Sequence, residues 1–394
     1  MTRTRSPKMI DDLSRKDGLY LRQTLFDKSR RIVVKVGSAV LTDEHGIALE
    51  VIENIAREIA FLHDSGREVI LVSSGAVAAG RARIGFKNGT SELGIKEKQA
   101  LAAIGQSSLM QIYDRVFSSR SQIIAQVLLT HKDLAVRKRY LNARNTLFTL
   151  FKFGAIPVIN ENDTVSVEEL RFGDNDMLGA HICNLIEADM FICLTDVVGM
   201  YTGNPASDPQ ARPIYTVDEI TPEVEAMASH AKSKLGTGGM RSKIRAAKIV
   251  SAGGGSSFIG PGREPDILRK LFSGEMVGTF FLPHKERISG RKRWIASVLK
   301  PKGKLILDEG ACKALVENNR SLLPSGIKKV EGDFGVGDAV HCATIEGQNI
   351  AVGLINYSSV DITKIRGYHS REIEKILGYC DSEEVIHRDN IVLL

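Results

Sequence analysis

The sequence has few cysteines, and their spacing does not suggest disulfide bonds that would stabilise a fold. Its five cysteines are scattered, odd in number and include no CxxC pair: Cys183, Cys193, Cys312, Cys342 and Cys380. This pattern argues against a disulfide framework and a zinc site, and it predicts a reducing, cytoplasmic compartment. No stretch approaches about 18 uninterrupted apolar residues, so we expect no transmembrane helix.

Two phosphate-binding signatures are also missing. The Walker A pattern GxxxxGK[ST] does not occur, and no GxGxxG follows the first predicted strand. Their absence disfavours a P-loop nucleotide site and a dinucleotide-binding fold.

The chain has little net charge outside its first residues. Residues 1–31 hold nine Lys/Arg and four Asp/Glu, which accounts for +5 of the total +6. This basic segment lacks the apolar core of a signal peptide. We therefore interpret residues 1–30 as a disordered or loosely docked N-terminal extension.

The remaining chain alternates short apolar runs with longer helical patterns. Predicted strands cover residues 31–36, 68–73, 122–128, 156–160 and 190–195, and predicted helices follow at 49–65, 133–151 and 174–187. Continuous apolar strands separated by crossover helices are typical of a doubly wound, mostly parallel α/β sheet.

The texture changes after residue 282. Residues 283–300 are polar, basic and turn-rich, and from residue 301 short strands alternate with Gly and Asp turns. A length of 394 residues also suits two domains better than one core. We predict an α/β domain at 31–282, a linker at 283–300 and a small β-rich domain at 301–394.

Candidate ligand-binding residues follow the ends of the predicted strands, where open α/β sheets bind ligands. Lys35 lies near the end of the first strand, before a glycine turn, which suits phosphate oxygens. Ser74 follows the second strand, before a predicted helix. Taken singly, Lys35 is equally consistent with an exposed strand end, and Ser74 with an ordinary helix cap.

The densest polar cluster follows the strand at 156–160. Residues 160–163 read Asn-Glu-Asn-Asp, and residues 172–176 end in Asp-Asn-Asp where a helix begins. One aspartate would satisfy the cap, so we interpret the excess as a binding site. Asp163 and Asp176 suit a cationic α-amino group, and Asn175 offers both a donor and an acceptor.

Two further segments suit a nucleotide. Thr195 and Asp196 end the strand at 190–195, although Asp196 is also a common turn residue. Residues 234–243 are rich in glycine and place Lys243 in the first turns of a helix, which would surround a phosphate with amides and one ammonium.

Two lysines near phosphate-suited turns, Lys35 and Lys243, predict phosphoryl transfer between two anions. Ammonium groups and backbone amides offset the charge repulsion between such reactants. A carboxylate acceptor is ionised at neutral pH and needs no general base.

Together these motifs resemble the amino acid kinase family. The resemblance rests on residues 34–38 (VKVGS), 72–80 (VSSGAVAAG), 157–163 (PVINEND), 173–176 (GDND), 194–196 (LTD) and 236–240 (GTGGM), in the family's order. The NEND, GDND and GTGGM segments are specific to members that phosphorylate the side-chain carboxylate of free L-glutamate with ATP. The extension before Arg31 is longer than the family pattern.

The resemblance implies a role for each matching position. Lys35 and Lys243 would contact the transferring phosphate from two sides, and Asp174 would orient both lysines. Glutamate would be held by Ser74, Asp163, Asn175 and Asp176. The nucleotide would be held by Lys35, Thr195, Asp196, Thr237, Gly238, Gly239, Met240, Arg241, Ser242 and Lys243, and Mg²⁺ would arrive with ATP.

The family also implies partners. The product, glutamyl phosphate, is the first intermediate toward proline, and proline is the typical feedback inhibitor at an overlapping site. Members are usually dimers or tetramers, and a glutamyl phosphate reductase is a possible partner.

The C-terminal residues, including 308–310, 322–327 and 332–334, resemble a PUA domain, a fold that binds RNA in other proteins. Residues 301–394 carry 11 Lys/Arg against 14 Asp/Glu, a net charge of −3. Since nucleic-acid affinity depends on basic surface, we do not predict RNA binding.

Two alternative functions for the whole chain are an RNA-binding protein and a kinase of the same fold acting on acetylglutamate, aspartate, carbamate or a nucleotide.

Overall fold

The chain forms two compact units, which divide between residues 287 and 288 in a computed structural model. The structure describes residues 15–43, 46–86, 93–166, 175–203, 205, 208–227, 239–284, 295 and 299–394. The division falls within the segment interpreted as a linker. Each unit has its own sheet and hydrophobic core. No helix among the described residues is long and apolar enough to cross a bilayer.

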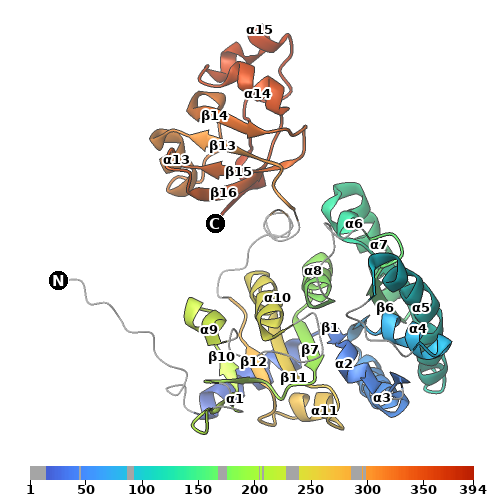
Figure 1. Cartoon of the computed structure of the whole chain (residues 1–394). Coiled ribbons are helices and arrows are strands. Elements are labelled where there is room, and N and C mark those ends of the chain that lie inside the picture. The colour runs from blue at the N-terminus through green and yellow to red at the C-terminus, as the bar shows by residue number, and fades with distance from the viewer. Residues whose placement is uncertain are drawn as a thin grey trace. The chain divides into compact units, whose positions relative to one another are not determined.

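The first unit is built on an eight-stranded sheet with the order β10-β12-β11-β7-β1-β4-β6-β5 (Figure 1). Its strands are β1 (Arg31–Val36), β4 (Glu68–Ser73), β5 (Ile123–Leu129), β6 (Ala155–Glu161), β7 (Met190–Thr195), β10 (Thr216–Val217), β11 (Ser256–Pro261) and β12 (Thr279–Phe281). The six strands from β11 to β5 are parallel, and β12 runs antiparallel to β11. The prediction of a mostly parallel α/β sheet is confirmed.

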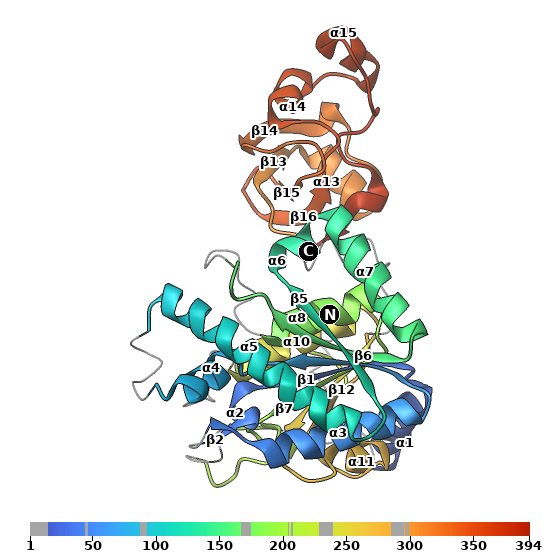
Figure 2. The ribbon, with the colours of Figure 1, turned by 90° about the vertical axis from the view of Figure 1, so that its right-hand side faces the viewer.

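Helices cover both faces of this sheet. They are α1 (Arg15–Lys28), α2 (Ser38–Leu41), α3 (Leu49–Asp64), α4 (Ala76–Ile84), α5 (Ile95–Ser118), α6 (His131–Ala135), α7 (Arg137–Lys152), α8 (Asn175–Ile186), α9 (Pro222–Met227), α10 (Met240–Ala252) and α11 (Ile267–Phe272). In Figure 2, α8 and α10 lie above the sheet, and α1, α3 and α11 lie below it.

The side chains of β1 point alternately to the two faces of the sheet. Ile32, Val34 and Val36 pack into the core that also contains residues of α3 and α5. Because successive side chains of a strand point to opposite faces, Lys35 lies on the other face, together with α8 and α10. The strand order also reverses at β1, which has β4 on one side and β7 on the other. Ligands of open α/β sheets bind at such a reversal.

The described part of the N-terminal extension, residues 15–30, includes α1 and is docked on the first unit, which corrects the interpretation of this part as disordered or loosely docked; residues 1–14 lie outside the described residues. In α1, Phe26 is fully buried, with ring centroids 5.3 Å from Phe272 and 5.1 Å from Phe280. Arg22 is also fully buried, and its guanidinium lies 5.5 Å from the Phe280 ring centroid. Burial lowers the pKa of Arg22 to about 10. The charged composition of this segment does not predict that Arg22 and Phe26 are buried.

The second unit contains a five-stranded sheet with the order β14-β13-β15-β16-β17. Its elements are β13 (Gly303–Leu307), α13 (Glu309–Val316), β14 (Ile327–Gly332), β15 (Ala339–Ala343), β16 (Asn349–Leu354), α14 (Ser359–Ile365), α15 (Ile373–Leu377) and β17 (Ile391–Leu393). A separate core fills this unit, including Leu305, Val340 and Ile362. The β-rich character predicted for residues 301–394 is confirmed.

Docking of α1 makes a testable contribution to stability. We expect Phe26→Ala to lower the free energy of unfolding by about 3 kcal/mol, because it removes a fully buried aromatic ring. Leu21→Ala is the matched control, since Leu21 lies on the same helix and is 42% exposed. Urea unfolding measures both variants. An equal effect of the two substitutions would show that α1 is not packed as described.

Candidate active site

The site is organised by a carboxylate between two lysines, one from the sheet and one from a helix. Asp176, in the first turn of α8, forms ion pairs with Lys35 of β1 through Oδ1 and with Lys243 of α10 through Oδ2, the latter at 3.1 Å. Ser242 Oγ donates to the same Oδ2 at 2.6 Å. All three charged side chains are buried, with exposures of 0% for Asp176, 4% for Lys35 and 5% for Lys243. The two predicted catalytic lysines therefore meet on one carboxylate.

A glycine allows α8 to approach the sheet closely enough for this contact. Gly179 lies one helical turn after Asp176, and a Cβ at Gly179 would lie 2.6 Å from the Phe191 ring of β7. The same Cβ would lie 3.6 Å from Lys35 Cβ. Any larger side chain would push α8 away from β1 and β7, and would carry Asp176 away from Lys35.

The electrostatics of Asp176 depend on its neighbours. Burial alone would raise its pKa, but Lys35 and Lys243, with hydrogen bonds from Lys35 and Ser242, lower the pKa to about 2. The carboxylate is therefore ionised throughout the physiological range. Cys193 Sγ lies 3.4 Å from Asp176 Oδ1, and burial first, then the Asp176 charge, raise the thiol pKa to about 12.

A second set of polar residues lies beside the ion pairs. It centres on Asn175, the residue of α8 that precedes Asp176. Asn175 Nδ2 donates to the Ser73 carbonyl at 2.6 Å, to Ser74 Oγ at 3.0 Å and to Asn160 Oδ1 at 2.8 Å. Asn160 lies near the end of β6, whose residues are all buried, and Ser74 follows β4. The C-terminal ends of β4 and β6 and the N-terminal end of α8 therefore converge. Two predicted substrate residues, Ser74 and Asn175, are in contact there.

Asp163 lies in the turn after β6, where its backbone N–H donates to the Glu161 carbonyl at 3.0 Å. Three other residues of the predicted site, Asp174, Thr237 and Gly238, lie outside the described residues. Their roles stay predictions.

The described residues predicted to hold the nucleotide lie at the end of β7, which pairs with the strand of Lys35, and at the start of α10, which carries Lys243. Thr195 ends β7, is 4% exposed, and donates through Oγ1 to Asp196 Oδ1 at 3.0 Å. Gly239 caps the N-terminus of α10. Within α10, Met240 and Lys243 face inward, Ser242 is half-buried, and Arg241 is exposed.

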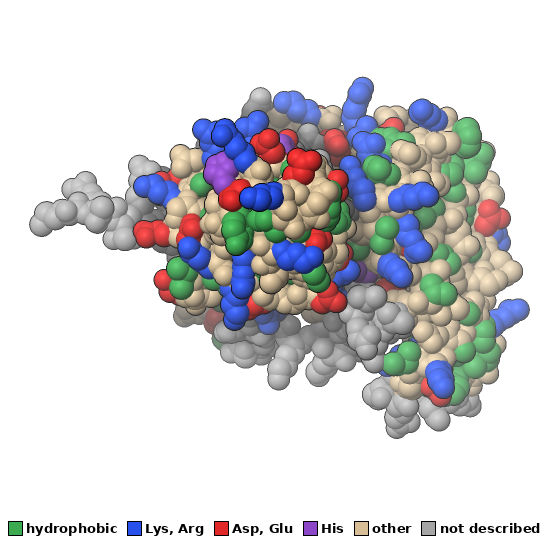
Figure 3. All heavy atoms as spheres, turned by 90° about the horizontal axis from the view of Figure 1, so that it is seen from above, with side chains coloured by type: hydrophobic (Ala, Val, Ile, Leu, Met, Phe, Trp, Pro, Cys, Tyr) green, Lys and Arg blue, Asp and Glu red, His purple; other side chains and the backbone are tan. Residues whose placement is uncertain are grey.

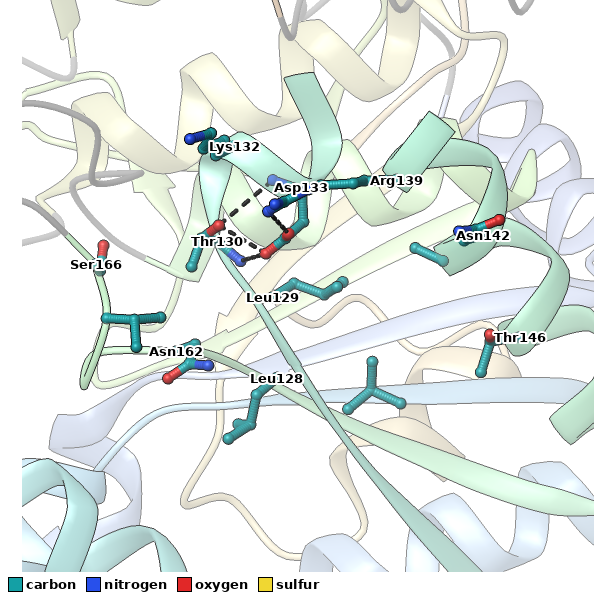
Figure 4. A pocket seen from close by; sticks show the side chains of 13 residues that line it. Leu128, Leu129, Thr130, Lys132, Asp133, Arg139, Asn142, Thr146, Asn162 and Ser166 are labelled. Carbon is teal, nitrogen blue, oxygen red and sulfur yellow. Dashed lines mark hydrogen bonds and ion pairs between the residues drawn. The ribbon is translucent and has the colours of Figure 1, made fainter. Parts of the chain in front are cut away.

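A hollow of about 660 Å³ lies next to the loop that carries Asp163. Figure 4 shows Asn162 and Ser166 of this loop across from Asn142 and Thr146 of α7. Its upper wall is fixed by Asp133, which accepts from Thr130 Oγ1 at 2.6 Å and from Arg139 at 2.9 Å. Neither Lys35 nor Lys243 lines this hollow. It is separate from the lysine pair.

Two protein-family models match this chain, one in each unit. The model of the amino acid kinase family matches residues 30–259. The chain belongs to the amino acid kinase family. A PUA domain model matches residues 303–377 within the second unit.

Several relatives match over nearly their whole length. The chain is 60% identical to a glutamate 5-kinase from Desulfotalea psychrophila over 376 residues, covering 95% of this chain and 100% of the relative. It is 48% identical to a glutamate 5-kinase from Syntrophus aciditrophicus, covering 95% and 96%. It is 49% identical to a glutamate 5-kinase from Thermus thermophilus, covering 93% and 97%.

Similar solved structures are more distant. A carbamate kinase from Giardia lamblia bound to AMP-PNP is 17% identical with a TM-score of 0.47, covering 65% of this chain and 99% of that chain. A UMP kinase from Bacillus anthracis is 16% identical with a TM-score of 0.44, covering 64% and 96%. These likenesses are too distant to add to the assignment.

Sequence patterns alone did not single out three residues of the site. Asn160 was part of the predicted acid–amide cluster but had no role of its own, and its contact with Asn175 gives it one. Cys193 lies inside an apolar strand and carries no signal. Gln106 bonds Asn160 from the middle of α5, where nothing marks it as a site residue.

The ion pairs of Asp176 predict a specific dependence of stability on pH. The folded pKa of about 2 lies below the unfolded value of about 3.9. The carboxylate therefore stabilises the fold fully above pH ~4, and this contribution is lost as the pH falls through about 2. We expect Asp176→Asn to be less stable than wild type by about 2 kcal/mol or more at pH 7.

The difference should shrink as the pH falls from 5 toward 2, as measured by urea unfolding at each pH. Ser242→Ala removes one hydrogen bond to the same carboxylate but keeps both ion pairs. We expect it to keep most of the wild-type pH dependence, with the loss of stability starting at a slightly higher pH, because the hydrogen bond is one of the smaller causes of the low Asp176 pKa. A difference between wild type and Asp176→Asn that does not vary with pH would contradict the paired, ionised carboxylate.

Proposed function

We propose that this chain transfers the γ-phosphate of ATP to the side-chain carboxylate of free L-glutamate, giving L-glutamyl 5-phosphate. The observation that carries this proposal is the buried Asp176 between Lys35 and Lys243, at the point where the strand order reverses. The glutamate 5-kinase relatives, up to 60% identical over their full length, support the same reaction.

Charge repulsion is the main barrier to this reaction, because the attacking carboxylate and the triphosphate are both anionic. Two buried ammonium groups offset that repulsion where negative charge accumulates. One carboxylate oxygen of glutamate forms the new bond to phosphorus, while the bond from phosphorus to the bridging oxygen of ADP breaks. The acceptor is already ionised, so no side chain has to remove a proton.

We assign an orienting role to Asp176, while the role predicted for Asp174, which lies outside the described residues, stays a prediction. Asp176 contacts both lysines and carries a charge that keeps their ammonium groups close together. We assign glutamate to Ser74, Asp163 and Asn175. Ser74 and Asn175 are hydrogen-bonded to each other, and Asp163 lies in the turn after β6. Asp163 suits the α-amino group, and the Ser74 hydroxyl and Asn175 amide suit carboxylate oxygens.

The nucleotide would lie along the ends of β7 and α10. Thr195 and Asp196 would border it on one side, and residues 237–243 on the other. The α10 N-terminus and Lys243 suit phosphate oxygens. Among the described residues no three acidic, His or Cys side chains group to hold a metal. Mg²⁺ would come bound to the phosphates of ATP, where it neutralises part of their charge.

The wider setting of this reaction is also proposed. The product would enter proline biosynthesis, with proline as the feedback inhibitor at a site overlapping that of glutamate. The enzyme would act in the cytoplasm as a dimer or tetramer and supply a glutamyl phosphate reductase.

RNA binding by the PUA domain is not part of this proposal. The net charge of −3 over residues 301–394 is unsuited to a polyanion. Figure 3 shows acidic and basic side chains interspersed over the visible face of this unit. We favour a role in assembly or regulation.

A hydroxamate assay tests the reaction and its acceptor together. The purified protein is given ATP, Mg²⁺ and hydroxylamine with glutamate, N-acetylglutamate or aspartate separately. We expect hydroxamate with glutamate alone, and less of it when proline is added. Product from N-acetylglutamate or aspartate instead would keep the kinase chemistry and overturn the substrate.

The two lysines should act on the transition state. We expect Lys35→Ala and Lys243→Ala each to lower kcat by about 10² or more, because each removes an ammonium group that faces developing charge. Lys248→Ala is the matched control, since Lys248 is an exposed lysine of the same helix α10, paired with Glu225. Near-wild-type kcat in either site variant, measured by coupled ADP release, would remove that lysine from catalysis.

Asp163 should act on substrate affinity instead. We expect Asp163→Ala to raise the KM for glutamate about tenfold or more, because a charged hydrogen-bond partner of the α-amino group is lost. The KM for ATP should change little. Steady-state kinetics with each substrate varied in turn measures both constants, and an unchanged glutamate KM would exclude Asp163 from the substrate site.

A further inference from the structure

A line of amide side chains runs from the proposed substrate site into helix α5. Asn175 Nδ2 donates to Asn160 Oδ1 at 2.8 Å, and Asn160 Nδ2 in turn donates to Gln106 Oε1 at 2.8 Å. Gln106 is half-buried in the middle of α5, 54 residues before Asn160. Gln106 thus reaches Asn175 through a single intermediate amide.

The direction of this chain is fixed by a backbone group. Asn160 Oδ1 also accepts from the Glu161 backbone N–H at 2.9 Å, and a backbone N–H can only donate. The oxygen of Asn160 must therefore face Glu161 and Asn175, and its NH₂ must face Gln106. Since Asn160 is 3% exposed, that NH₂ needs an acceptor within the protein. Gln106 Oε1 supplies it.

The position of Gln106 is set by the backbone of its helix. A Cβ on Gly105, the preceding residue, would lie 1.8 Å from the Ala76 carbonyl oxygen and 2.4 Å from the Gly80 backbone nitrogen. Helix α5 therefore crosses α4 backbone against backbone, with no side chain between them. Because α4 begins directly after the Ser74 turn, this crossing locks Gln106 to the same turn that carries Ser74.

We propose that Gln106 is a positioning residue for the substrate side of the site. Through Oε1 it holds the Asn160 amide in the orientation that receives Asn175, and Asn175 then holds Ser74 Oγ. The proposal rests on the proposed function, in which Asn175 and Ser74 contact glutamate. Gln106 acts through Asn160 and not on the substrate itself, so it sets affinity for glutamate and leaves the lysine pair unchanged.

Two substitutions separate the effect of the Gln106 acceptor oxygen from the effect of its side-chain size. Gln106→Met keeps the length of the side chain and removes the acceptor, and Gln106→Glu keeps an acceptor oxygen for Asn160. We expect Gln106→Met to raise the KM for glutamate about tenfold, with the KM for ATP and kcat each within about threefold of wild type. Gln106→Glu should restore most of the glutamate affinity. Ser107→Met, at an exposed neighbour on α5, is the control for added bulk.

A double-mutant cycle tests the route through Asn160. If Gln106 acts only through Asn160, then adding Gln106→Met to Asn160→Leu should raise the glutamate KM no further. Additive effects would overturn this route, and so would a Gln106→Glu variant as impaired as Gln106→Met. An unchanged KM in Gln106→Met would refute the proposal while the kinase reaction stands. If the wild-type protein does not phosphorylate glutamate at all, the proposed function fails and this role fails with it.

Discussion

The structure of the site depends on one buried carboxylate that neutralises two buried ammonium groups. Transferring such charges out of water is expensive, and the expense is offset only while all three remain paired. Asp176 on α8, Lys35 on β1 and Lys243 on α10 therefore hold three separate elements in register at the reversal of the strand order. The same arrangement places two positive charges in a low-dielectric environment, where, in the proposed reaction, they would stabilise the transferring phosphoryl group.

The first turn of α8 serves both halves of the proposed reaction. Asn175 and Asp176 are neighbours, yet one bonds the turn after β4 and the end of β6, and the other bonds the lysines. A helix places successive side chains about 100° apart, so a single turn can supply two sites. Gly179, one turn later, keeps the helix close enough to the sheet for both contacts.

The sequence supports the architecture and the location of the site well, because both follow from local patterns. Apolar runs mark the buried strands, and polar residues after those runs mark the edge where ligands bind, so Lys35, Ser74 and the cluster after β6 are found without a structure. The partner of the lysines is not found this way. Composition alone does not show which acid near the helix start contacts the lysines, and the structure shows that Asp176 contacts both. Gln106 could not be predicted for a different reason, because its partner Asn160 lies 54 residues later in the chain. The docking of α1 was missed because charge dominates its composition.

The central claim is that the transferring phosphate lies between the two lysines, and a crystal structure with Mg²⁺, a non-hydrolysable ATP analogue and glutamate tests it most directly. The account predicts that the Nζ atoms of Lys35 and Lys243 both lie within hydrogen-bond distance of γ-phosphate oxygens, with Asp176 still paired to the lysines. The side-chain carboxylate of glutamate should face the γ-phosphorus. A γ-phosphate bound away from both lysines would contradict the account.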